Sequence, residues 1–212
     1  MKIVDMKIKE YMDILKTDEP APGGGSVSGV TAAQGIALTL MVLELTIGKE
    51  KYKEYEEKNI EIRGECIKLY NELLNAADAD KEAFIKLSKG YKLPKSTDEE
   101  KQNRKEVIGK LSLAATKAPF EVIIKSYDAL KLTEKIVGKS NKMASSDLGV
   151  AAACLEAAAK SAWLNVKINL PYLIDEDYKT RFEKEGKDTL DKIKKLSKQI
   201  YEEVKGALWW QR

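Results

Sequence analysis

A glycine-rich turn that opens a long run of small residues constrains this chain more than any other feature. The turn consists of Pro22, Gly23, Gly24, Gly25 and Ser26. Glycines lack Cβ atoms, so this backbone can turn sharply with its N–H groups exposed. Ser26 is a favourable N-cap residue. The run over 26–47 is small, apolar and free of proline, and it predicts one helix that stops at Gly48.

The turn has two interpretations that the residues alone leave open. A helix start next to a flexible turn leaves N–H groups unpaired at the positive end of the helix dipole, where they attract an anion. The alternative is a hinge in front of a buried helix. A P-loop is excluded because no Gly-Lys-Ser/Thr follows and no strand precedes the turn.

Composition favours a helical enzyme or binding protein over a nucleic-acid binder. The 212 residues suit one domain, 1–212. The 37 basic and 34 acidic residues nearly balance, whereas nucleic-acid binding calls for clustered positive charge. Cys66 and Cys154 lie in apolar helical contexts and are expected to be reduced. The first residues lack the apolar segment of a secretory signal, so we expect a cytoplasmic protein.

Histidine is absent from the sequence. This removes the commonest metal ligand and the commonest general base. In an enzyme, proton transfer would then fall to Asp, Glu, Lys, Tyr or Cys.

The spacing of apolar residues predicts helices throughout. We expect helices over 5–16, 26–47, 58–89, 97–117, 120–137, 148–169 and 175–207, with Pro119 interrupting the fourth and starting the fifth. The fold class is therefore all-α: a bundle of six to eight helices. The helix over 26–47 is long enough to span a membrane, but its Gln, Glu and Thr residues favour a buried core helix.

Two stripes of small residues predict the central helix pair. They are Gly25, Gly29, Ala33 and Ala37 on one helix, and Ala151, Leu155, Ala158 and Ala162 on another. Such stripes allow helix backbones to approach closely. The pair Trp209 and Trp210 near the end of the sequence is expected to pack on the body or on a partner subunit.

One carboxylate lies on an otherwise apolar stripe. The stripe consists of Cys66, Tyr70, Leu73, Ala77, Asp80, Phe84 and Leu87. Burial raises the pKa of an unpaired carboxyl group, so Asp80 is either a buried structural acid or a catalytic acid/base in a pocket. Asp78 points elsewhere on the helix and is expected to be solvated.

Two further signals lie on the helix expected over 148–169. Ser145, Ser146 and Asp147 form an N-terminal helix signal. Asn165 and Asn169 share one face of an apolar segment, where they either satisfy backbone groups or line a pocket.

Six blocks together carry a resemblance to a known family. They lie at 22–26, 45–52, 78–84, 91–101, 146–152 and 165–170. In this order they resemble the formiminotetrahydrofolate cyclodeaminase / methenyltetrahydrofolate cyclohydrolase family, over nearly the whole chain and in its free-standing bacterial form.

The resemblance implies an all-helical homodimer that binds a tetrahydrofolate derivative as substrate and needs no metal; we expect no other cofactor. From the balanced charge and the polar residues of the helix over 26–47, we expect neither nucleic acid nor membrane as a partner. It also implies that Asp80 is catalytic. The substrate-binding residues that we expect are Pro22, Gly23, Gly24, Gly25, Ser26, Ser146, Asp147 and Asn165.

The expected activity is hydrolysis of 5,10-methenyltetrahydrofolate to 10-formyltetrahydrofolate. The blocks around 46–49 and 92–95 are most similar to free-standing cyclohydrolases, and no transferase half is present to supply a formimino substrate. The alternative is formiminotetrahydrofolate cyclodeaminase, which releases ammonia and forms the methenyl compound. A remote alternative is a non-catalytic helical binding protein of the same fold.

Overall fold

Six α-helices account for most of residues 1–209, the part of the chain described by the computed structural model. The α-helices are α1 (Ile8–Leu15), α2 (Gly24–Glu44), α3 (Glu56–Tyr91), α4 (Asp98–Ile136), α5 (Ser145–Asn169) and α6 (Glu176–Trp209). Four short 3-10 helices join them: η1 (Ile3–Asp5), η2 (Glu50–Tyr55), η3 (Lys142–Ala144) and η4 (Leu170–Tyr172). The expected all-α bundle is confirmed.

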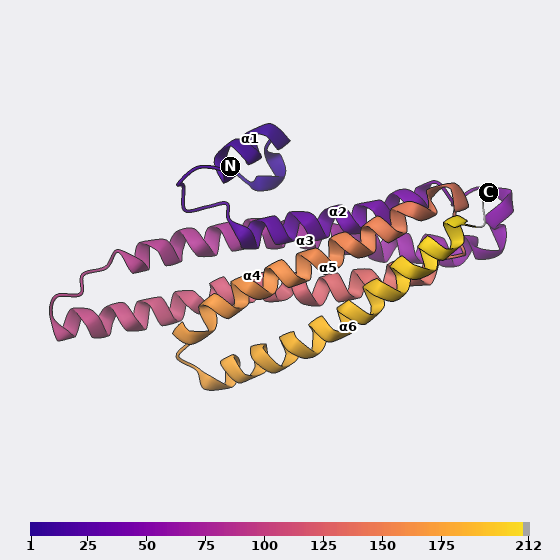
Figure 1. The fold of residues 1–212 in the computed structure, drawn as a ribbon. Coiled ribbons are helices and arrows are strands. Elements are labelled where there is room, and N and C mark those ends of the chain that lie inside the picture. Colours follow the sequence, from indigo (N-terminus) through magenta and orange to yellow (C-terminus); the bar gives the residue numbers. More distant parts are fainter. Residues whose placement is uncertain (210–212) are drawn as a thin grey trace.

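Figure 1 shows α2 to α6 lying side by side in an elongated bundle, with α1 on one flank. The hairpin of α3 and α4 extends beyond the other helices at one end. The opposite end holds the turn between α4 and α5 and the last turns of α6. The main core runs along the bundle and includes Ile36, Leu73 and Leu155, all fully buried.

Small residues let α2 pack closely between α3 and α5. The predicted stripe of α5 does meet α2, through Ala151 and Leu155, but the glycines of the predicted α2 stripe, Gly25 and Gly29, face α3. A Cβ atom on Gly29 would lie 2.9 Å from the backbone nitrogen of Ala77 in α3. A Cβ atom on Gly35 would lie 2.8 Å from Cγ of Leu155 in α5. Both distances are shorter than real carbon contacts, so the two helices fit against α2 only because these positions are glycine.

Among the described residues, α2 is the one helix long and apolar enough to span a membrane. However, 56% of its most apolar window is buried inside the bundle, as in a core helix. The Thr39 hydroxyl hydrogen-bonds the Thr133 hydroxyl of α4 at 2.8 Å, so this polar group is satisfied by a neighbouring helix.

The predicted interruption at Pro119 is wrong, because α4 runs continuously through it. A proline has no N–H to donate to the carbonyl four residues earlier, which here is that of Ala115. Asn169 of α5 supplies the missing donor, with its side-chain nitrogen 3.0 Å from the Ala115 oxygen. A side chain from the next helix therefore satisfies the carbonyl that the proline leaves free.

The predicted solvation of Asp78 is also wrong. The first residues fold back over α3, and the Ile3 N–H donates to Asp78 Oδ1 at 2.6 Å. Only 7% of Asp78 is exposed. The helical period correctly turned Asp78 away from Asp80, but it did not reveal that the N-terminal segment covers this second face.

Several element boundaries differ from the prediction by a few residues. The first α-helix begins at Ile8, later than expected, and follows the separate turn η1. Helix α2 ends at Glu44, and the chain then turns through to Gly48, whose φ of +78° suits glycine. The prediction for the Trp209 and Trp210 side chains lies outside the described residues.

Gly29→Ala should destabilise the protein because the new methyl group meets the backbone of α3. Overpacking of this kind costs about 1–3 kcal/mol, which outweighs the roughly 1 kcal/mol gain in helix propensity. Gly64→Ala in α3 is the matched control, because a Cβ atom there has no neighbour within 4 Å, and it should stabilise. Urea unfolding of both variants tests this; equal gains in stability would contradict the close packing.

Candidate functional site

The carboxylate of Asp80 lies against the first turn of α2. The Ser26 hydroxyl donates to Asp80 Oδ2 at 3.0 Å, and Ser26 is fully buried. The predicted N-cap role of Ser26 is therefore wrong. The helix begins two residues earlier, at Gly24, and Gly23 is the N-cap residue without a side-chain hydrogen bond. The hydroxyl is instead committed to α3.

The glycines of the turn make room for side chains of two other helices. A Cβ atom on Gly25 would lie 2.0 Å from Asp80 Oδ1, which no side chain can tolerate. A Cβ atom on Gly24 would lie 3.3 Å from the side-chain nitrogen of Asn165 in α5. The turn thus brings Asp80 and Asn165 close to the same stretch of backbone.

These groups line one cavity of about 160 Å³, which we call the Asp80 cavity. Its lining residues are Pro20, Gly23, Gly24, Gly25, Asp80, Phe84, Ala115, Asn165, Ile168 and Asn169. They come from the turn before α2 and from α2, α3, α4 and α5. The cavity therefore brings together three features predicted from distant parts of the sequence: the glycine turn, Asp80 and Asn165.

Both interpretations of the asparagine pair are confirmed. The Asn165 side-chain nitrogen donates to the Ser161 carbonyl at 2.9 Å, and that of Asn169 donates to the carbonyls of Ala115 and Asn165 at 3.0 Å each. The two residues thus satisfy backbone groups and line the Asp80 cavity as well. Within residues 1–209 no hydrogen bond reaches either side-chain oxygen, so both oxygens remain acceptors for a ligand.

Burial raises the pKa of Asp80 from 3.8 to about 6, although the Ser26 hydroxyl and backbone N–H act in the opposite direction. Among the described residues, no lysine or arginine lies within ion-pair distance of Asp80. The Tyr11 hydroxyl is buried and has no hydrogen-bond partner in the described part of the chain. Burial and the charge of Asp80 raise the pKa of Tyr11. A buried carboxylate without a cation favours a positively charged ligand.

The mouth of the Asp80 cavity is apolar. Phe84, which the stripe pattern placed in the core, is 39% exposed at this position, and Ile168 is 68% exposed. The pattern identified the correct helix face, but this end of the face opens into the cavity. Exposed apolar side chains around a carboxylate suit a flat ring with a cationic group.

Other predicted site residues lie elsewhere. Ser146 is exposed at the start of α5, nineteen residues from Asn165 and thus about 28 Å along the helix. Asp147 shares that distant end, and α5 starts with Ala144 as its N-cap, without a side-chain cap. Pro22 is buried and does not line the cavity, whereas Pro20 does.

Sequence reasoning missed Ala115 and Ile168 and left Asn169 undecided. Pro119 contained a usable signal for two of them. A proline inside a helix frees the carbonyl four residues earlier, which then needs a donor from a neighbouring helix. Asn165 and Asn169, on the helix expected over 148–169, carry side chains that could supply such a donor. No comparable signal identified Ile168, because its exposure depends on where the helices end.

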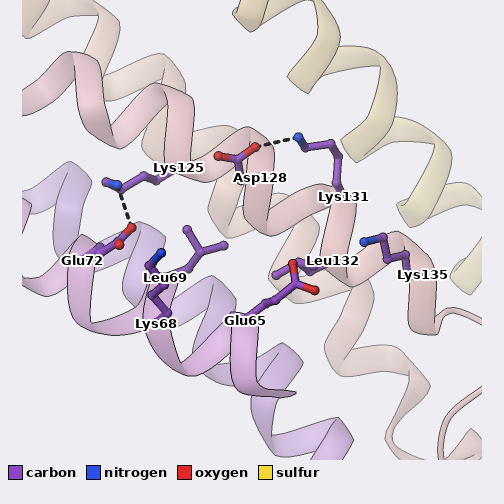
Figure 2. Close-up of a pocket in the computed structure, with 9 residues that line it drawn as sticks. All are labelled: Glu65, Lys68, Leu69, Glu72, Lys125, Asp128, Lys131, Leu132 and Lys135. Carbon is purple, nitrogen blue, oxygen red and sulfur yellow. Dashed lines mark hydrogen bonds and ion pairs between the residues drawn. The ribbon is translucent and has the colours of Figure 1, made fainter. Parts of the chain in front are cut away.

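A larger surface hollow of about 360 Å³ lies between α3 and α4, and its charges largely neutralise one another. Figure 2 shows Lys125 beside Glu72 and Lys131 beside Asp128, each pair at 2.7 Å. We therefore place the candidate site at the Asp80 cavity. No group of three Cys, Asp or Glu side chains within the described part of the chain is arranged to hold a metal ion.

The raised pKa of Asp80 predicts how stability changes with pH. The folded protein binds the Asp80 proton more tightly than the unfolded chain, so this carboxyl costs stability as the pH rises through about 6. The cost reaches about 3 kcal/mol above that pH. Asp80→Asn lacks it, so the variant should gain stability relative to wild type between pH 4 and pH 8. Urea unfolding across that range tests this; a constant difference would contradict it.

Comparisons with known proteins agree on one family. The family model described as formiminotransferase-cyclodeaminase matches residues 7–188. A methenyltetrahydrofolate cyclohydrolase of Methylorubrum extorquens is 35% identical over 95% of this chain and 97% of its own length. A formimidoyltransferase-cyclodeaminase of Gallus gallus is 34% identical over 76% of this chain, which spans only 30% of that protein.

A solved structure supports the same assignment. The formiminotetrahydrofolate cyclodeaminase of Thermotoga maritima is similar with a TM-score of 0.79 and 29% identity, and the match covers 98% of each chain. The family model, the full-length relative and this structure agree, and the chain belongs to the formiminotransferase-cyclodeaminase family of folate one-carbon enzymes.

Proposed function

We propose that this chain hydrolyses 5,10-methenyltetrahydrofolate to 10-formyltetrahydrofolate, with Asp80 as the catalytic residue. The observation that carries the proposal is the buried carboxylate of Asp80, which has no cationic partner among residues 1–209 and lies in a cavity with an apolar mouth. The substrate's reactive carbon bridges two nitrogens as a cationic amidinium on a flat ring system. The full-length similarity to a cyclohydrolase supports this reaction.

Asp80 suits the role of general base in this reaction. A pKa near 6 leaves the carboxylate mostly ionised at neutral pH yet basic enough to accept a proton. Its charge stabilises the bound cation, and it takes a proton from the water that attacks the bridging carbon. Collapse of the carbinol forms the formyl C=O and breaks the bond to N5, which takes up a proton. Overall one water is consumed and one proton is released.

The neighbouring residues hold the carboxylate and the ligand. Ser26 fixes one oxygen of Asp80, and Gly25 leaves the other uncovered by a side chain. Gly23, Gly24 and Asn165 are proposed to contact the substrate, together with Asn169. Ser146 and Asp147 are too distant within one chain to join them.

Cyclodeamination is the second candidate. The Thermotoga maritima structure supports it, because that similar protein is a formiminotetrahydrofolate cyclodeaminase over nearly its whole length. Both reactions pass through a tetrahedral carbon bearing three heteroatoms, so one carboxylate serves either. Two assays separate them: loss of the methenyl chromophore reports hydrolysis, and ammonia release from formiminotetrahydrofolate reports deamination.

We further propose a cytoplasmic homodimer without metal, other cofactor, nucleic acid or membrane. Exposed apolar side chains on α2, at its C-cap and on α5 support the dimer: Met41, Leu45, Val150, Leu164 and Ile168 are each at least 39% exposed. A cavity of about 160 Å³ also falls below the usual volume of a ligand site, so one chain encloses only part of a folate.

Light scattering at micromolar concentration should give twice the chain mass of 23.7 kDa. Leu164→Glu should shift the protein to monomer, since Leu164 is 71% exposed on α5. Ile60→Glu, on an exposed position of α3, is the matched control and should remain dimeric. A monomeric wild type, or the same change of mass in both variants, would contradict the dimer proposal.

Asp80→Asn should hydrolyse the substrate about 10²–10⁴-fold more slowly than wild type, because an amide cannot accept the proton. It should still fold, dimerise and bind the unreactive analogue 5-formyltetrahydrofolate. Asp78→Asn is the control: it lies outside the cavity, under the N-terminal segment, so its turnover should stay within about threefold of wild type.

Near-normal turnover by Asp80→Asn would remove Asp80 as the catalytic group. A loss of turnover shared equally by both variants, with lowered unfolding midpoints, would instead indicate two structural carboxylates.

A further inference from the structure

A second cavity, of about 490 Å³, lies beside the Asp80 cavity at the same end of the bundle. We call it the basic cavity. Its lining residues are Lys101, Arg104, Lys105, Ile108, Pro171, Tyr172, Leu173, Ile174 and Glu176. Its volume lies in the usual range of ligand sites.

The charges of the basic cavity are not balanced internally. Three cationic side chains of α4 face one carboxylate, Glu176, which pairs with Lys179 at 3.2 Å. Lys101 pairs with Asp98 on the exposed surface. Arg104 and Lys105 have no acidic partner within ion-pair distance among residues 1–209. The cavity therefore attracts an anion.

Arg104 supplies a specific donor as well as charge. One terminal nitrogen of its guanidinium donates to the Tyr91 carbonyl at 3.3 Å, which holds the side chain against the tip of the α3–α4 hairpin. Its Nε is buried and finds no acceptor in the described part of the chain. Its second terminal nitrogen makes no hydrogen bond among residues 1–209, so the guanidinium can donate from there to a carboxylate oxygen in the cavity.

The two cavities are adjacent along the same elements. On α4, Ala115 of the Asp80 cavity and Ile108 of the basic cavity are seven residues apart, or about 10 Å along the axis. After α5, Asn169 of the first cavity and Tyr172 of the second are separated by two residues. The exposed rings of Tyr91 and Tyr172 pair edge to face at this end of the bundle.

We propose that the basic cavity binds the glutamate carboxylates of the folate whose reactive ring lies in the Asp80 cavity. The inference rests on the proposed function. The proposed substrate, 5,10-methenyltetrahydrofolate, has a cationic ring at one end, a rigid aryl spacer, and a dianionic glutamate at the other end. That order of charges matches a carboxylate cavity next to a cationic one. Arg104 is the principal donor and Lys105 adds charge.

Calorimetric binding of two unreactive ligands tests this assignment. One is 5-formyltetrahydrofolate; the other is its analogue in which a methylamide replaces the glutamate. Arg104→Gln should weaken binding of the first ligand about 10- to 100-fold, the range for a lost hydrogen bond to a charged group. It should change binding of the second ligand by less than about twofold. In wild type, the first ligand should bind more tightly than the second.

Two further variants keep the test decisive. Lys105 is exposed, so Lys105→Gln should weaken binding less than Arg104→Gln does, and again only for the glutamate-bearing ligand. Lys110→Gln removes one charge from the same helix outside the cavity and should change neither affinity. Equal losses for both ligands, or no loss in Arg104→Gln, would overturn the inference.

The outcomes separate this inference from the proposed function. Wild type that binds and hydrolyses folate, with no ligand-selective effect of Arg104→Gln, removes only the basic cavity as a subsite. If Arg104→Gln shows the ligand-selective loss of affinity but wild type turns over no methenyl substrate, the proposed reaction is wrong and the basic cavity remains a subsite. Wild type that binds neither ligand removes both.

Discussion

The close approach of Asp80 to the first turn of α2 is the contact on which the site depends. Only a glycine at position 25 leaves room for the carboxylate oxygen, and the buried Ser26 hydroxyl holds the second oxygen at 3.0 Å. The same close packing continues along α2, where Gly29 meets the backbone of Ala77. One run of small residues thus brings α3 close enough to carry a carboxylate into the cavity and excludes the water that would lower its pKa.

A second constraint connects α4 to the same cavity. Pro119 leaves the Ala115 carbonyl without its helical donor, and Asn169 of α5 provides one. The interaction fixes Asn169 beside Asn165 and completes the polar wall opposite Asp80. The apolar mouth, the carboxylate and the amide wall then suit a flat cationic ring, and in the proposed hydrolysis Asp80 takes the role that a histidine often has.

Patterns within single helices predicted much of this arrangement. The period of α3 identified Asp80, and the stripe of α5 identified the face that meets α2, because both depend on neighbours in sequence. The glycines of the α2 stripe instead face α3. Asp78, Ser26 and Phe84 were misplaced because their environments depend on other segments: the N-terminal segment, the carboxylate of α3 and the opening of the cavity. No sequence pattern identified Arg104, because its side chain is held by the Tyr91 carbonyl at the end of a different helix.

The ionisation of Asp80 is the central claim. The most direct measurement is a carbon-13 NMR titration of the Asp80 carboxyl carbon in the free protein, assigned by comparison with Asp80→Asn. The account predicts a midpoint near pH 6, lowered when a cationic methenyl ligand binds. A midpoint near 3.8, unchanged by the ligand, would show a solvated carboxylate and contradict the account.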